Sequence, residues 1–100
     1  MTNSERRISR QRAFLPPPGE AKADWWIISR LAAELGYARA FSWQHPHEVF
    51  CEHAALSGFE NDGQRAFDIG GLADLSREAW DALTPVRWPV SRSAAPWRLT

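Results

Sequence analysis

Cysteine, methionine and tyrosine are scarce in this chain, which has one of each among its 100 residues. The single cysteine, Cys51, excludes an internal disulfide, and it cannot by itself hold an iron–sulfur cluster, which takes several cysteine ligands. An excess of one charge is also absent, because 12 Lys and Arg balance 12 Asp and Glu. A free-standing nucleic-acid binder usually carries a clear basic excess, so this balance argues against nucleic acid as a partner.

Long apolar runs are missing too. No run approaches the roughly 18 residues that a membrane-spanning helix needs, so we expect no membrane partner. The first residues also lack the apolar segment of a secretory signal. Together with the unpaired cysteine, these features favour a cytoplasmic location. What the chain does have is a hydrophobic fraction of 44%, with six Trp and five Phe, which is typical of a globular protein.

The composition changes along the chain and predicts three parts. Residues 1–20 form a basic arm that ends in a proline-rich stretch, where a helix is excluded. Residues 21–90 carry the helical periodicities, and residues 91–100 are an irregular tail without a clear period. Within the arm, residues 4–14 could form a short strand or stay extended, and no alternating strand pairs are evident.

Apolar residues at intervals of three and four predict three helices and a mainly α fold. The first helix is expected over residues 24–35, with Asp24 as its N-cap and Gly36 just past its end. The second is expected to begin near Pro46 and to stop at Gly58. The third is expected over residues 76–83 with Ser76 as its N-cap. The unit is therefore predicted to be small and helical, with irregular arms at both ends.

Two clusters of side chains allow more than one interpretation. The first contains nitrogen and sulfur groups of the kind that bind zinc, although packing or solvent exposure is the simpler interpretation; its members are His45, His47, Cys51 and His53. The arginines of residues 6–12 could hold an anion or form a solvated charged arm. No nucleophile elbow and no close pair of carboxylates is recognisable, so we assign neither catalytic residues nor a metal site.

Asp24 also has two interpretations. Its carboxylate could cap the first helix, or it could accept hydrogen bonds from the donor edge of a base, with Trp25 or Trp26 against a flat ring. The residues alone favour the cap.

Several segments resemble the molybdopterin oxidoreductase superfamily. Residues 2–7 (TNSERR) and 18–25 (PGEAKADW) are similar to a stretch shared by that superfamily, which includes periplasmic nitrate reductases and formate dehydrogenases. Residues 53–61 (HAALSGFEN), 65–70 (RAFDIG), 85–86 and 88–90 look like the large subunit of assimilatory nitrate reductases. The resemblance covers about residues 2–90 and marks the chain as an internal piece of such a bacterial subunit, inactive alone.

The resemblance implies a larger α/β enzyme that reduces nitrate to nitrite at molybdenum. The metal would be held by two molybdopterin guanine dinucleotides, and the parent would usually carry a [4Fe–4S] cluster. The expected partners are the remainder of the nitrate reductase chain and an electron-donor protein or reductase subunit. The alternatives are a fragment of a related enzyme such as a formate dehydrogenase, or an independent helical interaction module.

The resemblance carries over one cofactor contact directly. Asp24 matches an acidic residue that contacts a guanine dinucleotide end of the cofactor, and a carboxylate can accept two hydrogen bonds from guanine N1–H and N2–H₂. Asn3 and Arg7, in the other shared segment, could line the same region. Cys51 matches neither the metal ligand nor the cluster ligands of the family. We therefore predict a wall for the cofactor rather than a complete active site.

Overall fold

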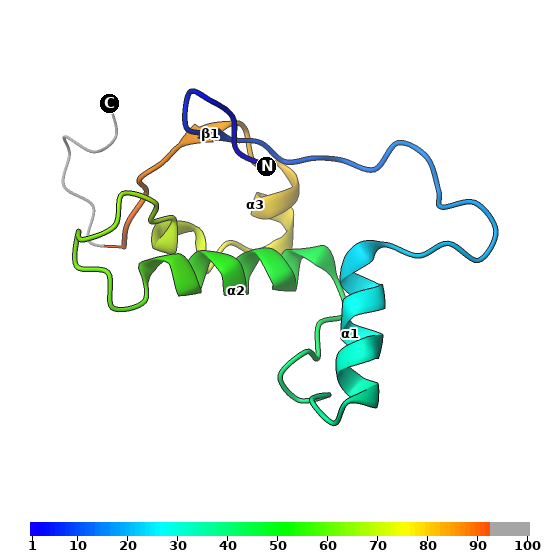
Figure 1. The fold of residues 1–100 in the computed structure, drawn as a ribbon. Helices are drawn as coiled ribbons and strands as arrows, with labels where there is room; N and C mark the ends of the chain where they lie inside the picture. Colours follow the sequence, from blue (N-terminus) through cyan, green and yellow to red (C-terminus); the bar gives the residue numbers. More distant parts are fainter. Residues whose placement is uncertain (93–100) are drawn as a thin grey trace. The chain divides into compact units, whose positions relative to one another are not determined.

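The computed structural model describes residues 1–92, and Figure 1 shows the order of their helices and strands. The elements are β1 (Arg7–Ile8), α1 (Asp24–Glu34), α2 (Pro46–Gly58), the 3-10 helix η1 (Gly70–Leu72), α3 (Arg77–Asp81) and β2 (Val86–Arg87). The expectation of a small, mainly helical chain with three α-helices is therefore confirmed. The described residues form two compact units, which we call the first unit (residues 1–11 and 50–92) and the second unit (residues 12–49). The expected division at residues 20 and 90 stays a prediction, and the structure of residues 93–100 of the tail lies outside the described residues.

The second unit is built around α1, which ends as its sequence predicts. Gly36 has a positive φ of 93°, a conformation that glycine adopts without a steric penalty. Its N–H donates to the carbonyl of Ala33, and the N–H of Tyr37 donates to the carbonyl of Ala32 at 2.8 Å. These two bonds form a Schellman motif, which satisfies carbonyls that the helix leaves free.

The start of α1 differs from the prediction. Ala23 is the N-cap, with extended backbone angles and no side-chain cap hydrogen bond, and Asp24 is the first helical residue. The expectation that Asp24 caps the helix is therefore wrong. A carboxylate in the first turn is still favoured by the positive end of the helix dipole, so acidic character at this position does not by itself identify the cap.

The apolar stripe of α1 forms, but most of it remains exposed. Ala32 is buried, whereas Ile28, Leu31 and Leu35 are 52%, 60% and 65% exposed. Such a row of large apolar side chains is typical of a helix that packs against further protein.

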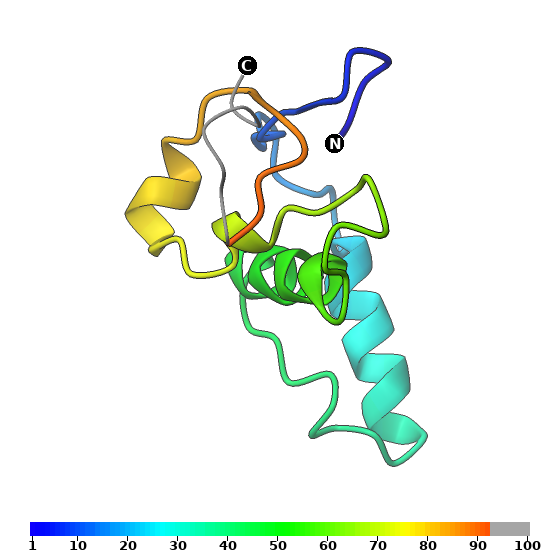
Figure 2. The same ribbon diagram turned by 90° about the vertical axis from the view of Figure 1, so that its left-hand side faces the viewer.

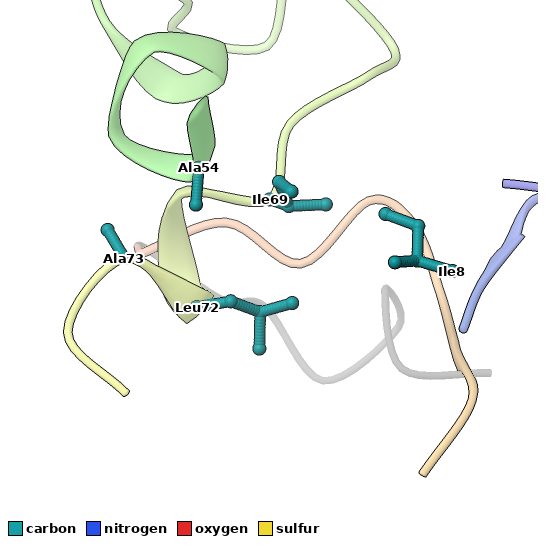
Figure 3. Packing of buried hydrophobic residues seen from close by; sticks show 5 residues of the cluster. All are labelled: Ile8, Ala54, Ile69, Leu72 and Ala73. Atoms are coloured by element: carbon teal, nitrogen blue, oxygen red, sulfur yellow. The ribbon is translucent and has the colours of Figure 1, made fainter. Parts of the chain in front are cut away.

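The core of the first unit combines segments from both ends of the chain. Figure 3 shows its buried members, which are Ile8, Ala54, Ile69, Leu72 and Ala73. The partly buried side chains around them come from α2, from the segments on either side of η1, and from β2 and the residues after it. The N-terminal segment thus contributes an apolar side chain to a core that is otherwise made by residues 50–90.

A short antiparallel ladder joins β1 to β2. Arg7 pairs with Arg87 and Ile8 pairs with Val86, and Thr2 forms a further bridge to Ile8 on the other side of β1. The sequence-based expectation of no strand pairs is wrong at this point. The reason is that two residues are too few to produce a detectable alternation of apolar and polar side chains.

Two close backbone contacts hold η1 in place. η1 lies beside α2 in both ribbon views (Figures 1 and 2). A Cβ atom on Gly58 would come within 3.3 Å of the Cα of Gly70, and one on Gly71 would come within 2.9 Å of the carbonyl oxygen of Val90. A side chain at Gly71 would therefore require the backbone to shift, whereas one at Gly58 would require a smaller displacement of its neighbours.

A buried asparagine organises the loop between α2 and η1. The side chain of Asn61 is 1% exposed, and its Oδ1 accepts from the N–H of Arg65 at 2.6 Å. Its Nδ2 donates to the carbonyls of Ser57 and Arg65 and to Oδ2 of Asp68. Oδ1 of Asp68 in turn accepts from the N–H of Gly70 at 2.9 Å. Each polar atom of this buried amide therefore has a partner, as burial requires.

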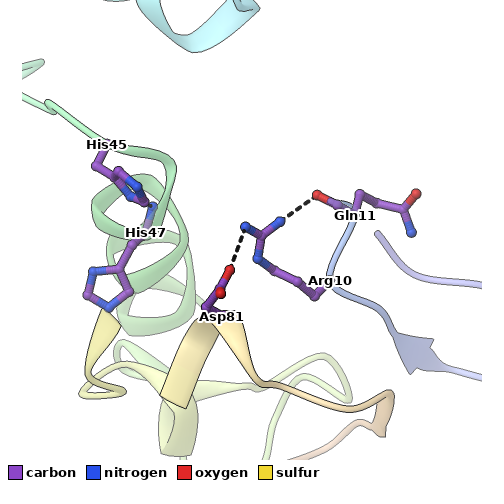
Figure 4. A network of polar contacts seen from close by, with 5 residues as sticks. All are labelled: Arg10, Gln11, His45, His47 and Asp81. Atoms are coloured by element: carbon purple, nitrogen blue, oxygen red, sulfur yellow. Dashed lines mark hydrogen bonds and ion pairs between the residues drawn. The ribbon is translucent and has the colours of Figure 1, made fainter. Parts of the chain in front are cut away.

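α3 is short and confirms its predicted cap. Ser76 Oγ accepts from the N–H of Ala79 at 3.1 Å, and the helix ends at Asp81, two residues before the expected end. Trp80 is buried, and the guanidinium of Arg10 lies 3.7 Å from the centre of its ring. Arg10 also bonds to Asp81 Oδ1 at 3.3 Å and to the carbonyl of Gln11 (Figure 4). These contacts hold the N-terminal segment against α3.

Replacing Asn61 with Ala should destabilise the first unit by about 2–3 kcal/mol, because it leaves the N–H of Arg65 and its neighbours without partners. Urea unfolding of the chain measures this change. Gln64→Ala is the matched control, since Gln64 is an exposed residue of the same loop and should change stability by less than about 0.5 kcal/mol. Equal effects of the two substitutions would contradict the assigned role of Asn61.

Candidate functional site

The carboxylate of Asp24 is available for an external ligand. Asp24 is exposed at the start of α1, and no group within residues 1–92 makes a hydrogen bond or an ion pair with its side chain. Both carboxylate oxygens can therefore accept hydrogen bonds from outside the described chain. The structure therefore excludes the interpretation of Asp24 as a helix cap. It leaves the interpretation of Asp24 as a hydrogen-bond acceptor for an external ligand.

Two indole side chains and two cations lie close to this carboxylate in the sequence. Trp25 is half-buried, and Trp26 is 39% exposed. The Nζ of Lys22 and the guanidinium of Arg30 lie 5.6 Å and 5.5 Å from the centre of the Trp26 ring, within the range of a cation–π contact. The beginning of α1 thus combines a hydrogen-bond acceptor, a partly exposed indole and positive charge, groups that can recognise an anionic heterocycle.

Asn3 and Arg7 meet in a tight turn of the first unit. Asn3 Oδ1 accepts from the N–H of Glu5 at 2.9 Å and from the N–H of Arg7 at 3.0 Å. The turn places Arg6 at a positive φ of 63°, and Arg7 Nε lies 3.4 Å from a carboxylate oxygen of Glu5. The structure therefore brings Asn3 and Arg7 together, whereas Asp24 belongs to the second unit.

The histidine and cysteine cluster does not converge. Within residues 1–92, no group of three or more His, Cys, Asp or Glu side chains could hold a metal ion. His45 Nδ1 accepts from the N–H of His47 at 3.0 Å, and Figure 4 shows their two rings at the start of α2. The ring of His53 packs against that of Phe67, with centroids 5.6 Å apart. For His53, packing within the fold is therefore the correct interpretation.

Cys51 is half-buried on α2. Its Sγ lies 3.9 Å from the carbonyl oxygen of Leu75. Burial raises the pKa of the thiol, and the negative charge of Asp74 raises this pKa further. A raised pKa keeps the sulfur protonated at neutral pH, which is the opposite of what a nucleophile or a metal ligand needs.

A concave region of the first unit, with a volume of about 840 Å³, lies along the Asn61 loop. Its lining includes Gly58, Asp68 and Gly70, together with Arg65 and Arg92. Arg65 donates to the carbonyl of Phe59 at 2.8 Å, and Arg92 pairs with Asp74 at 2.9 Å. Both guanidinium groups therefore already have partners within the fold. These contacts stabilise the loop that lines the concave region, and we assign no ligand to it.

Sequence reasoning missed the roles of Ser57, Asn61 and Asp68. Ser57 Oγ accepts from the N–H of Ile69 at 2.8 Å and donates to the carbonyl of Ala54 at 2.7 Å, so it extends the Asn61 network. All three lie in the segments 53–61 and 65–70, which resemble the large subunit of assimilatory nitrate reductases. That resemblance assigns no function to their side chains. The available signal was the concentration of short polar residues beside Gly58 and Gly70, which indicates side-chain bonds to the backbone.

The comparisons with known proteins identify the family of the chain. Residues 1–34 match the molybdopterin oxidoreductase family. The chain is 82% identical over 97 residues to a nitrate reductase of Klebsiella oxytoca, which covers 97% of this chain and 11% of that protein. It is 36% identical over 99 residues to the assimilatory nitrate reductase catalytic subunit of Bacillus subtilis (strain 168), covering 96% of this chain and 12% of that protein. The chain therefore belongs to the molybdopterin oxidoreductase family.

A relative with another activity aligns over a shorter stretch. The F420-dependent formate dehydrogenase subunit alpha of Methanocaldococcus jannaschii is 45% identical over 51 residues, which covers 51% of this chain and 8% of that protein. No solved structure matches the chain. The chain spans 11% and 12% of the lengths of the two nitrate reductases, and no helix within residues 1–92 is long and apolar enough to cross a membrane.

The thiol of Cys51 should react with iodoacetamide with a midpoint at higher pH in the folded chain than in urea, since the thiolate is the reacting form. Asp74→Asn should lower this midpoint, and Asp62→Asn, an exposed carboxylate, is the control. The fold favours the neutral thiol, so its contribution to stability is present below the unfolded pKa and is lost as pH rises through the folded pKa. Identical midpoints for the folded and unfolded chains would refute the assignment.

Proposed function

We propose that the chain is part of the catalytic subunit of a bacterial assimilatory nitrate reductase and forms part of the wall around its molybdenum cofactor. The observation that carries the proposal is the open carboxylate of Asp24 in a chain that aligns over 97% of its length with a nitrate reductase. The parent reaction is the two-electron reduction of nitrate to nitrite, which consumes two protons and releases water.

The residues at the start of α1 suit the guanine end of a molybdopterin guanine dinucleotide. Guanine presents N1–H and N2–H₂ as adjacent donors, and both oxygens of Asp24 are free to accept. Hydrogen bonds to a charged acceptor are stronger than neutral ones, so a single carboxylate can contribute substantially to holding the base. Trp26 offers an indole surface within reach of two cations. When bound, the cofactor supplies the molybdenum that exchanges the oxygen atom and the electrons.

The chain's own part in the reaction is to bind and orient the cofactor. Asp24 would hold the base. We propose separately that Asn3 and Arg7, in the first unit, contribute hydrogen-bond donors to cofactor binding in the parent subunit. Since Cys51 is the only cysteine, the cysteine ligands of a [4Fe–4S] cluster would come from other parts of the parent subunit. The remainder of that subunit and an electron-donor protein or reductase subunit are the proposed partners, and the proposed location is the cytoplasm.

The exposed face of α1 supports a place inside a larger protein. Large apolar side chains of a free-standing domain are normally covered, yet those of α1 remain more than half exposed in residues such as Leu31 and Leu35. A reductase about nine times longer than the chain, as the coverage of 11% implies, has ample protein to cover this face. The alternative of an independent helical interaction module predicts a closed tryptophan core, whereas Trp26 is 39% exposed.

Asp24→Ala in the full-length subunit should reduce both bound molybdenum and nitrate reduction by about tenfold or more, because guanine loses its charged acceptor. Glu34→Gln, an exposed acid at the other end of α1, is the matched control and should leave both quantities unchanged. Metal analysis and a nitrite assay of the purified subunits measure the two effects. Full cofactor content together with full activity in Asp24→Ala would rule out the proposed contact.

The isolated 100-residue chain should bind a hydrophobic dye through α1, and it should hold no molybdenum and form no nitrite. Replacing Ile28 and Leu31 with Ser should lower the dye fluorescence by roughly twofold or more, because these side chains make up much of the exposed stripe. Ala33→Ser, an exposed position of the same helix, is the control. A signal that does not respond to the double substitution would show that the stripe is not the accessible apolar surface.

A further inference from the structure

Two arginines lie directly opposite each other on the outer face of the β1–β2 ladder. Arg7 pairs with Arg87, and the neighbouring pair of Ile8 and Val86 belongs to the core or packs against it. Successive side chains of a strand point to opposite faces, so the two guanidinium groups share the solvent side. Like charges at directly opposite positions destabilise a ladder, so a negative charge close to both guanidinium groups would stabilise this pair.

The structure provides only part of that charge. Glu5 lies 3.4 Å from Arg7 Nε, but both side chains are largely exposed, so the pair contributes little. The side chain of Arg87 is exposed and makes no hydrogen bond or ion pair with any group in residues 1–92. Within the described part of the chain, Arg7 and Arg87 are thus compensated by a single carboxylate, that of Glu5, which is held weakly.

Asn3 adds a third donor to the same row. Its N–H donates to the carbonyl of Arg7 at 3.0 Å, so Asn3 lies across β1 from Arg87. Its Oδ1 is already used by the N–H groups of Glu5 and Arg7. The side-chain group left for an external partner is therefore the Nδ2 amide, which can only donate. The row of Asn3, Arg7 and Arg87 thus presents donors and positive charge, a set suited to an oxyanion.

We infer that Asn3, Arg7 and Arg87 form a binding site for a phosphate group on the outer face of the ladder. Guanidinium groups match phosphate oxygens with two parallel hydrogen bonds, and a multiply charged phosphate offsets the charges of both arginines. The phosphate could belong to the diphosphate of a dinucleotide cofactor or to free phosphate in solution. The site extends the proposed contacts of Asn3 and Arg7 to Arg87, and it rests on the proposed function only for the identity of the natural ligand.

Calorimetric titration of the 100-residue chain with inorganic pyrophosphate at low salt tests the site. Arg87→Gln should weaken binding by about tenfold or more, and Glu5→Gln should strengthen it because a competing carboxylate is removed. Arg87→Lys should retain part of the affinity, since it keeps the charge and loses the planar fork. Arg77→Gln, an exposed arginine at the start of α3, is the matched control and should bind as the unmodified chain does.

The melting temperature of the chain, with and without pyrophosphate, provides a second test of the site. Pyrophosphate should raise the melting temperature of the unmodified chain more than that of Arg87→Gln, and without ligand this variant should melt no lower than the parent because a like-charge pair is relieved. Equal affinity for Arg87→Gln and the unmodified chain would overturn the inference. Equal weakening by Arg87→Gln and Arg77→Gln would also overturn it, since that result indicates a general effect of charge.

The full-length subunit distinguishes the two sources of phosphate. If Arg87→Gln lowers the content of guanine dinucleotide cofactor, the site serves the cofactor. If the cofactor content stays the same while the chain's affinity for pyrophosphate falls, the site serves free phosphate. Failure of the proposed function is recognised separately, because Asp24→Ala would then leave the cofactor bound while pyrophosphate still binds to the row of Asn3, Arg7 and Arg87.

Discussion

The burial of Ile8 is the contact on which the first unit depends. Ile8 is 7% exposed in a core whose other members come from residues 50–90, and its strand pairs with β2. Without this side chain, a short polar segment rich in arginine would have little reason to remain on the fold, because burial of apolar surface is the main favourable term. The turn at Asn3 and the stacking of Arg10 on Trp80 belong to the same N-terminal segment and add polar and aromatic contacts to this burial. A small apolar anchor, together with the contacts of Arg10, therefore holds a segment that is rich in arginine.

The local features of the helices could be predicted from the sequence because they depend on neighbouring residues. The Schellman end at Gly36, the start of α2 at Pro46 and the cap at Ser76 each involve groups within a few positions of one another. The β1–β2 pair could not be predicted, since its two partners are far apart in the sequence and each strand has only two residues. The Asn61 network could be predicted only in part. The sequence shows its short polar residues as a motif, but their hydrogen bonds depend on the path of the loop, which the sequence does not reveal.

The candidate site was predicted unevenly for a similar reason. The family resemblance indicated Asp24, and the structure adds that its carboxylate is not used as a cap. Asn3 and Arg7 are close together, as a shared segment allows, while Arg87 became visible only through the register of the ladder. The resemblance could not indicate that a third donor faces them, because Arg87 lies in a distant segment. For α1, the periodicity of the sequence predicts the apolar stripe, and the structure shows which of its side chains are exposed.

The close approach of α2 and η1 has a consequence for how the chain can vary in length. Gly58 and Gly70 meet through backbone atoms, so the segment that joins them must begin and end at fixed points. Within it, Asp62 and Gly63 form a left-handed turn at the surface, whereas Asn61, Arg65 and Asp68 are bonded to one another or to the ends of the segment. An insertion could lengthen the tip at residues 62–64 as a solvent-exposed bulge. The same insertion a few positions later would separate the amide from its partners and open the end of the helix to water.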